Sequence, residues 1–451
     1  MGDAWKKLIF IALSYVGYIF IGYGVTRDQF PMLMGAFALL FVLLITAKSF
    51  AGSFTVSQLI TVGVLFRLSL LISSPELSDD FFRFIWDGRI LIAGGNPYAH
   101  LPSVLNGAEE VIETGLTPEL YQGLNSKQYY TVYPPVSQVV YGLGAFLGGD
   151  SIAGSIFWMR VILLLAEIGV MVILAKLLTH LNRPVHWLMW YAWNPLVIVE
   201  TVGNLHFEGL MLFFILLAIL LAIKDRLILS AMALGLAVST KLIPLMLVPF
   251  FFYHWEWKKW LVWAPLVGIT VLLTFSPFLS VELIQKFGSS VDLYFQSFEF
   301  NASIYYLVRE IGFLVMDYNI IQAAGPILSL ITGLGLLVLA FQSKWLQNDL
   351  FSKLVLGLMI YYAMATTVHP WYMITLVGLG VLSRWFFPIT WSLLIILSYS
   401  HYWGGGFEEN YWIIGIEYLL LILALFFENK LWHFMQIDQP KIENNEVHSE
   451  H

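Results

Sequence analysis

A long series of apolar runs constrains the fold of this chain more than any other feature. Runs of about 15 to 25 apolar residues match the hydrocarbon thickness of a bilayer, where backbone polar groups must be satisfied inside helices or closed barrels. The sequence therefore predicts an all-α polytopic membrane protein with about 12–14 transmembrane helices, in a single domain over residues 1–435. The expected spans lie at 8–24, 30–47, 54–73, 152–178, 187–202, 205–223, 227–239, 241–253, 260–276, 320–341, 354–368, 371–383, 386–400 and 412–428.

The composition supports this class and excludes others. Of the 451 residues, 59% are hydrophobic and only 12% are charged, a balance that soluble domains of this length do not show. The net charge of −7 argues against nucleic acid as a partner. Cysteine is absent, so disulfides and thiolate chemistry are excluded. The 17 Trp and 22 Tyr suit either interfacial belts or a cleft that binds sugar or lipid.

Lys and Arg at the span ends indicate the orientation of the chain in the membrane. They fall on one side if the glycine-interrupted stretch 134–148 is an interfacial helix rather than a span. Both termini are then cytoplasmic, and a disordered cytoplasmic tail follows over 436–451. The loops 74–133 and 277–319 lie outside, together with the polar stretches GNLHFEG, HPWY and YSHYWGGGFEEN. We expect a single extracytoplasmic active site, in a bacterial inner (cytoplasmic) membrane.

The segment SDDFFRFIWDGR follows the third span and concentrates charges at the membrane boundary, where charges are costly and mark functional sites. Read as a helix, it places Asp80, Arg83 and Asp87 within about 60° of one another on one face. Asp79 suits the N-cap of this helix, and Asp80 suits a general base tuned by the guanidinium. The alternative is a capping acid with a surface ion pair.

Three further candidates lie at span ends and breaks. Lys241, in AVSTKLIP, is flanked by apolar residues and needs an anion or a water-filled cavity. A phosphate would supply the anion, while snorkelling and a structural ion pair are the alternatives. His206 and Glu208, in GNLHFEG, could bind sugar hydroxyls, bind a cation or solvate a helix end. Their spacing is weak for metal ligands, so no metal is expected.

Turns that contain aromatic residues complete the set of candidates. In HPWY, proline forces a turn that leaves His369, Trp371 and Tyr372 at the external mouth. Arg309, which follows the stretch 292–306 of the second external loop, could be a second phosphate contact. In YYTVYPP, Tyr133 and its neighbours could line a saccharide or polyprenyl cleft, or anchor the loop at the interface.

SDDFFRFIWDGR, GGNPY, YPP, NPLVIVETVGN, STKLIP and HPWY occur in this order, and together they resemble the GT-C superfamily of integral-membrane glycosyltransferases. The resemblance is to family 87 polyprenyl-phosphate-mannose-dependent mannosyltransferases and to the related mannosyltransferase I of GPI-anchor synthesis. It extends over roughly residues 55–400. The two spans over 8–47 depart from the simplest family pattern, in which one span precedes the acidic loop.

The resemblance implies a GT-C fold and inverting transfer of a hexose, mannose in particular, from polyprenyl phosphate to an extracytoplasmic glycan or lipid acceptor. It implies an aspartate of the first external loop as the base, here Asp80 with Asp79 as its rival, and a basic residue at the donor phosphate, here Lys241. No cofactor or metal is implied. The other candidates would orient the base, hold phosphate or line the sugar site: Arg83, Asp87, Arg89, Tyr133, His206, Glu208, Arg309, His369 and Tyr372.

Two other classes of membrane protein share some of these features. A transporter or flippase of lipid-linked sugars also has broken helices and buried charges, but it predicts internal repeats and charged groups near the bilayer midplane. A polymerase or ligase of the O-antigen type has its large external loop late in the chain, whereas the major loop here, 74–133, comes early. Charge concentrated at one face favours the glycosyltransferase.

Overall fold

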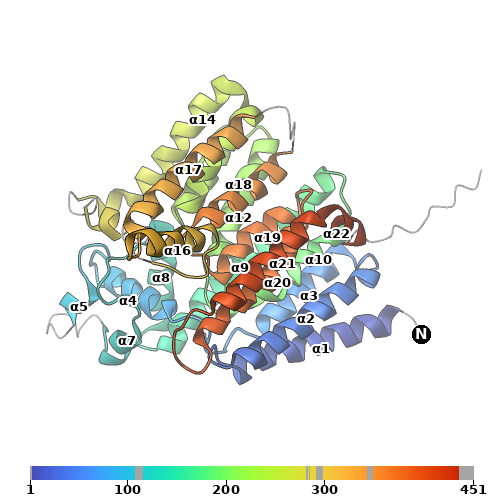
Figure 1. Ribbon diagram of the computed structural model, residues 1–451, viewed down its shortest axis with the longest axis horizontal. Coiled ribbons are helices and arrows are strands. Elements are labelled where there is room, and N and C mark those ends of the chain that lie inside the picture. The colour runs from blue at the N-terminus through green and yellow to red at the C-terminus, as the bar shows by residue number, and fades with distance from the viewer. Residues whose placement is uncertain are drawn as a thin grey trace, which may run out of the picture.

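The computed structural model describes residues 3–106, 115–280, 283, 285–290, 298–342 and 349–435, and its architecture is helical throughout these residues (Figure 1). Among them, an isolated bridge between Phe300 and Thr367 is the one β-type pairing. The all-α membrane architecture expected from the apolar runs is confirmed. The predicted tail over 436–451 lies outside the described residues.

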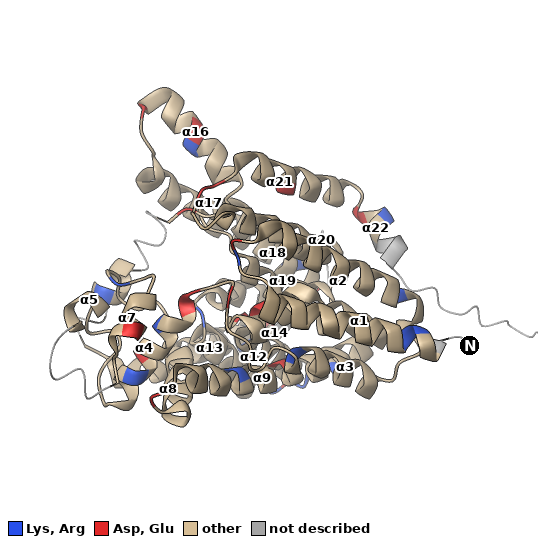
Figure 2. Ribbon diagram, turned by 90° about the horizontal axis from the view of Figure 1, so that it is seen from below, with Lys and Arg blue, Asp and Glu red and all other residues tan. Residues whose placement is uncertain are grey.

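The N-terminal part of the chain forms three packed helices, a set of shorter helices in the first long loop, and one long span. The helices are α1 (Asp3–Gly24), α2 (Phe30–Ala51), α3 (Val56–Leu68), α4 (Asp80–Ile92), α5 (Pro102–Leu105), α7 (Pro118–Gly123), α8 (Pro135–Gly148) and α9 (Ile152–His180). The loop helices α4, α5, α7 and α8 gather at one end of the molecule, and the N-terminus lies at the other end (Figures 1 and 2). The segment expected to be an interfacial helix is thus a helix, α8, at the end that carries the long loop.

The middle of the chain is divided into short elements. They are η1 (Val185–Leu188), α10 (Met189–Ala192), α11 (Pro195–Ile198), η2 (Val199–Gly203), α12 (Glu208–Ile223), α13 (Leu227–Val238) and η3 (Ile243–Phe251). Asn194 lies between α10 and α11. Its side chain caps α11 by accepting hydrogen bonds from the N–H groups of Leu196 and Val197, and Pro195 cannot continue the preceding helix. The segments Pro195–Gly203 and Glu208–Ile223 then meet at 110°. This bend places Glu208 beside Lys241, with which it forms an ion pair.

The C-terminal part forms a second group of helices. They are α14 (Phe252–Phe275), η4 (Ser276–Phe278), α16 (Ile304–Met316), α17 (Ile321–Phe341), α18 (Leu350–Met364), η5 (Pro370–Tyr372), α19 (Met373–Gly380), α20 (Phe387–Leu394), η6 (Ile395–Tyr402), α21 (Tyr411–Phe426) and α22 (Glu428–Met435). The pair α17 and α18 packs beside η3, and α22 lies near the N-terminus, away from the loop helices (Figures 1 and 2).

The described residues contain fewer long helices than the 12–14 transmembrane helices expected from the sequence. Five are long and apolar enough to cross a membrane, or six if the pair bent by 110° is one span. Four others, α3, α13, α18 and α21, are apolar but have only 10–17 residues. The difference arises because proline and buried polar groups divide several apolar runs. The run 241–253, for example, is the 3-10 helix η3, which contains Pro244 and Pro249.

A buried ion pair joins α3 to α9. Arg67 lies 2.7 Å from the Glu167 carboxylate, and both side chains are fully buried. Tyr191 donates to the same carboxylate at 2.8 Å, and Arg67 also donates to the carbonyl of Ala192 at 2.8 Å. Because the charges are paired and hydrogen-bonded, they fix the register of two helices that would otherwise meet through apolar side chains alone.

Replacing Glu167 with Ala is expected to lower the free energy of unfolding by about 3–5 kcal/mol, because it leaves the Arg67 charge buried without its partner. Thermal unfolding of the purified protein in detergent measures this loss. Asp225→Ala is the matched control, since its pair with Lys259 at 3.0 Å is largely exposed and contributes at most about 1 kcal/mol. Equal losses in the two variants would contradict the structural role assigned to the buried pair.

Candidate active site

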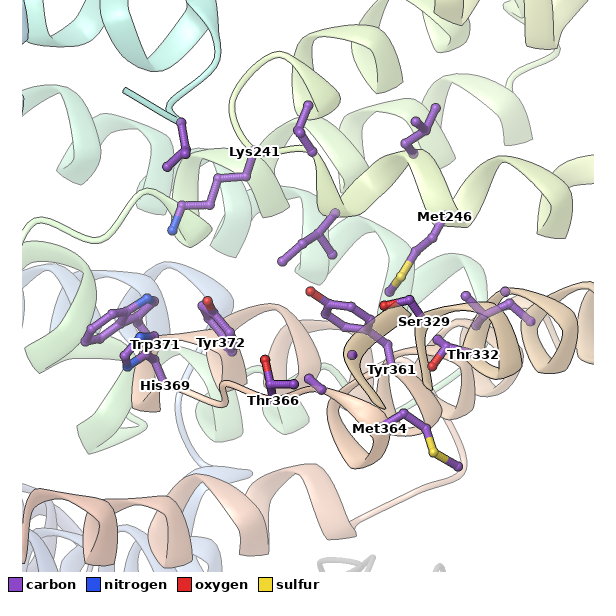
Figure 3. A pocket seen from close by; sticks show the side chains of 18 of the residues that line it. Lys241, Met246, Ser329, Thr332, Tyr361, Met364, Thr366, His369, Trp371 and Tyr372 are labelled. Carbon is purple, nitrogen blue, oxygen red and sulfur yellow. The ribbon is translucent and has the colours of Figure 1, made fainter. Parts of the chain in front are cut away.

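A cavity of about 550 Å³ lies between the end of the first long loop, η3, α17, α18 and the turn η5 (Figure 3). Most of its wall is apolar, and its charged side chains lie at one end. In Figure 3, Lys241 approaches Trp371 and His369 at that end, while Met246, Ser329 and Thr332 lie at the other. The polar end consists of Asp80, Tyr133, Lys241, His369, Trp371 and Tyr372.

Asp80 is the first residue of α4 and lines this polar end. Asn125 donates to one carboxylate oxygen at 2.9 Å, and the Tyr133 hydroxyl lies 3.4 Å from the other. Burial raises the pKa of the Asp80 carboxyl above its ordinary value, while the Asn125 hydrogen bond and the charge of Lys241 oppose this rise. A carboxylate with a raised pKa is a better proton acceptor at neutral pH than an ordinary aspartate.

Asp79 has a different environment from Asp80, although the two are adjacent. It occupies the N-cap position of α4 but makes no capping hydrogen bond. The Ser78 hydroxyl instead accepts the N–H of Asp80 at 3.3 Å. The Asp79 carboxylate pairs with Arg27 at 2.6 Å, which differs from the expected capping role because a guanidinium binds a carboxylate more strongly than backbone N–H groups do. Asp79 is not part of the cavity wall.

Arg83 and Asp87 form a buried pair behind the cavity. Their side chains meet at 2.8 Å. Arg83 also donates to the carbonyl of Tyr129 at 2.9 Å, and Gln138 donates to Asp87 at 3.1 Å. Asp80 and Asp87 share a face of α4 but do not meet at one place, because residues seven apart are separated by about 10 Å along a helix axis. The pair therefore ties α4 to the loop and to α8, and it supports the segment that carries Tyr133.

Arg89 also lies outside the cavity wall. It is buried, and it donates to the carbonyl of Gly115 and, at 2.8 Å, to that of Asp150. These bonds hold the part of the long loop around Gly115 close to the start of α9. The structure thus gives Arg89 contacts within the loop and does not bring it to Asp80.

Lys241 lines the same cavity as Asp80 and lies in the short connection between α13 and η3. Its ammonium group pairs with Glu208, the first residue of α12. The Lys241 side chain keeps 17% of its surface exposed, whereas that of Glu208 is almost completely buried. The bend before α12 supplies the carboxylate, and the break after α13 supplies the lysine. The charge of Lys241 is therefore both stabilised and open to the cavity.

Two histidines enclose Trp371 at the same end. The indole ring stacks on His206 with ring centres 3.7 Å apart, and on His369 with ring centres 4.3 Å apart. His369, Trp371 and Tyr372 line the cavity, whereas His206 is buried behind them, 3.3 Å from the Glu200 carboxylate. The stack fixes the HPWY turn, so that its polar edges face the cavity in one orientation.

Arg309 lies apart from the cavity, in α16. It pairs with Glu299 at 2.6 Å and with Glu310 at 3.0 Å, and its guanidinium lies 4.4 Å from the centre of the Tyr306 ring. It therefore makes no contact with the polar end where Lys241 lies. Within the described part of the chain, no group of three or more His, Asp or Glu side chains could hold a metal ion.

Two residues at or beside this site were not selected from the sequence: Asn125 and Glu200. Glu200 is a carboxylate inside the apolar stretch NPLVIVETVGN, and a charge in such a stretch is a signal that could have found it. Asn125 gave no signal, because a single amide in a polar loop is unremarkable until the fold places it beside Asp80.

The chain forms an all-helical membrane domain, and its apolar cavity carries a carboxylate and an ammonium group at one end. This arrangement defines an integral-membrane protein with a site suited to group transfer. A family model described as alpha-(1->6)-mannopyranosyltransferase, N-terminal domain, matches residues 11–257, which is more than half of the chain. The chain belongs to this family, and it is a membrane mannosyltransferase with the GT-C fold. No curated protein matches it.

The matched segment includes both Asp80 and Lys241, and it begins within α1. The two N-terminal spans that depart from the simplest pattern of the broader superfamily are thus largely covered by the family model. The match also makes the chain an enzyme of glycan biosynthesis, against the transporter or flippase considered as an alternative.

Proposed function

We propose that this mannosyltransferase takes mannose from a polyprenyl-phosphate donor and transfers it, with inversion at the anomeric carbon, to a hydroxyl of an extracytoplasmic glycan or glycolipid. One observation carries the proposal: Asp80 and Lys241 line the same end of one cavity whose remaining wall is apolar. An anionic base and a cation for phosphate are the two groups that such a transfer requires.

In the proposed reaction, the acceptor hydroxyl approaches Asp80 and the donor phosphate approaches Lys241. The oxygen of the acceptor forms a bond to the anomeric carbon, the bond from that carbon to the phosphate oxygen breaks, and the hydroxyl proton passes to Asp80. The phosphate leaves as an anion, and the Lys241 ammonium stabilises the charge that develops on it. Glu208 holds the Lys241 ammonium group in place before the donor arrives.

The apolar arm of the cavity suits the prenyl chain. Its walls come from η3, α17 and α18, and they include Leu242, Ile243, Met246 and Leu336. On α17, Gly325 and Gly333 leave room for a chain to lie against the helix. Burial of apolar surface drives such binding without a directional contact, so this arm would supply affinity while the polar end supplies specificity.

The sugar of the donor would lie between the two charged groups. There the Tyr133 hydroxyl, His369 and Tyr372 line the wall, and each offers a polar atom to a sugar hydroxyl. Trp371, held between two imidazoles, presents its edge rather than a ring face. The proposed sugar contacts are therefore hydrogen bonds and not stacking.

Incubation of the purified protein with a donor panel tests this function. The panel contains polyprenyl phosphomannose, polyprenyl phosphoglucose and GDP-mannose, each with a simple alkyl mannoside as acceptor. We expect transfer from polyprenyl phosphomannose alone, with an α-linked product from a β-linked donor. Transfer from GDP-mannose without lipid, or a product with the donor's own anomeric configuration, would exclude the proposal.

The extracytoplasmic orientation has its own test, helped by the absence of cysteine. Gln122, in the loop at the cavity end, and Lys224, beyond the far end of α12, are both exposed. In intact cells, a membrane-impermeant maleimide is expected to label Gln122→Cys and to reach Lys224→Cys only after the membrane is opened. The reverse pattern would place the cavity on the cytoplasmic side.

A further inference from the structure

The turn between α1 and α2 reaches the start of α4. Arg27, in this turn, pairs with the Asp79 carboxylate at 2.6 Å, and its guanidinium lies 4.8 Å from the centre of the Tyr402 ring. The next residue in the turn, Asp28, accepts the N–H of Gly404 at 3.1 Å through its carbonyl. Three segments thus meet around the Arg27 guanidinium, beside the proposed base: the turn between α1 and α2, the start of α4, and the YSHYWGGGFEEN segment.

Asp80 has charged or titratable neighbours on several elements. Asp79 precedes it in the chain, Lys241 with its partner Glu208 faces it from the α13–η3 connection and the start of α12, and Tyr133 faces it from the segment before α8. Tyr402, at the end of η6, also interacts electrostatically with Asp80. Asp79 is the negative group closest along the chain, and two adjacent carboxylates that are both ionised repel each other.

We propose that Arg27 is a positioning residue for the transfer reaction. By pairing with Asp79, it draws that carboxylate away from the cavity, neutralises its charge, and leaves Asp80 as the carboxylate that meets the acceptor hydroxyl. This inference rests on the proposed function, in which Asp80 is the base. It also gives the N-terminal hairpin a role, since the turn that carries Arg27 would select which of two neighbouring aspartates acts.

The physical basis is the balance of charge at the start of α4. Asp79 raises the pKa of Asp80, and Lys241 lowers it. When Arg27 is lost, the charge of Asp79 is no longer offset, so the pKa of Asp80 rises further and a smaller fraction of the base is ionised at neutral pH. The pair is about one third exposed on each side, so solvent screens part of this effect and the expected change in rate is moderate.

The test uses the full-length protein with polyprenyl phosphomannose as donor and an alkyl mannoside as acceptor. Five variants are compared: Arg27→Gln, Arg27→Lys, Asp79→Asn, the double variant Arg27→Gln with Asp79→Asn, and Asp80→Asn. We expect Arg27→Gln to lower kcat by roughly fivefold at neutral pH, to move the acidic limb of the pH–rate profile to higher pH, and to leave the KM for the donor nearly unchanged. Arg27→Lys, which keeps the charge, is expected to retain most of the activity.

The double variant separates this proposal from a purely structural role. Asp79→Asn removes the charge that Arg27 offsets, so the double variant is expected to recover to within about twofold of Asp79→Asn alone. A defect of Arg27→Gln that persists in the Asp79→Asn background, or an unmoved acidic limb, overturns the proposal for Arg27 while leaving Asp80 as the base. Full activity of Asp80→Asn overturns the proposed function itself.

Discussion

Replacing Asp80 with Asn is expected to lower kcat by about 10²–10⁴-fold, because the amide has nearly the shape of the carboxylate but cannot accept the acceptor's proton. The hydrogen bond from Asn125 and the contact with Tyr133 are compatible with the amide, so the fold and donor binding should survive. The rate of product formation from polyprenyl phosphomannose, measured under single-turnover conditions, gives this loss directly. Donor affinity measured separately should change by less than about threefold.

Asp79→Asn is the matched control, since it makes the same chemical change one residue earlier in the chain. Its carboxylate faces Arg27 and not the cavity, so we expect this variant to lose less than about threefold in kcat. If the two variants lost activity to the same extent, Asp80 could not be the base.

The pH dependence of the wild type gives a second measurement on the same group. Because burial raises the pKa of Asp80, and because only the ionised form can accept a proton, kcat/KM is expected to fall as the pH drops through this raised pKa. The acidic limb therefore lies at higher pH than an ordinary aspartate would give. Asn125→Ala removes a hydrogen bond that lowers the pKa, so it should move the limb to still higher pH.

Replacing Lys241 with Met is the second large change, with an expected loss of about 10²–10³-fold in kcat. The methionine keeps most of the volume and apolar surface of the lysine stem, but it removes the cation that would stabilise the departing phosphate. The loss should appear mainly in the transfer step rather than in the KM for the donor, because the prenyl arm of the cavity is unchanged. Single-turnover rates with polyprenyl phosphomannose separate the two effects.

Loss of Lys241 also leaves Glu208 buried without its partner, which could lower stability independently of catalysis. The double variant Lys241→Met with Glu208→Gln removes this penalty, and thermal unfolding should report its recovery. Activity should not recover, because the phosphate still lacks its cation. Lys224→Met, on the exposed far end of α12, controls for the loss of a positive charge in general. Recovery of activity in the double variant would show that Lys241 has only a structural role.

The sequence was most informative where one physical rule decided the outcome. Apolar runs separated by charged turns required a helical membrane protein, because a backbone in hydrocarbon has few other solutions. A lysine inside an apolar stretch and paired aspartates at a membrane boundary indicated candidate functional positions for the same reason, the cost of charge near lipid. Lys241 and Asp80, found in this way from distant parts of the chain, line one cavity in the structure.

The length of the helices and the roles of individual charges depended on the tertiary structure. A hydropathy pattern does not report where a helix ends inside an apolar run, so several expected spans are short or bent. Helical periodicity grouped Asp80, Arg83 and Asp87 on one face, but Arg83 and Asp87 pair with each other away from the cavity wall, and only Asp80 lines it. Arg309 had the right charge for a phosphate contact, yet the fold gives it Glu299 as a partner.

The sequence by itself determined that this chain is helical and membrane-embedded, because these properties follow from the composition of single segments and the solvent around them. Only the tertiary structure decided which charge meets which. Arg27 and Asp79 are far apart in the sequence and so are Lys241 and Glu208, and each pair forms because bends and loops bring them together. Pairing energies depend on distances between residues far apart in the sequence, and no local pattern encodes those distances.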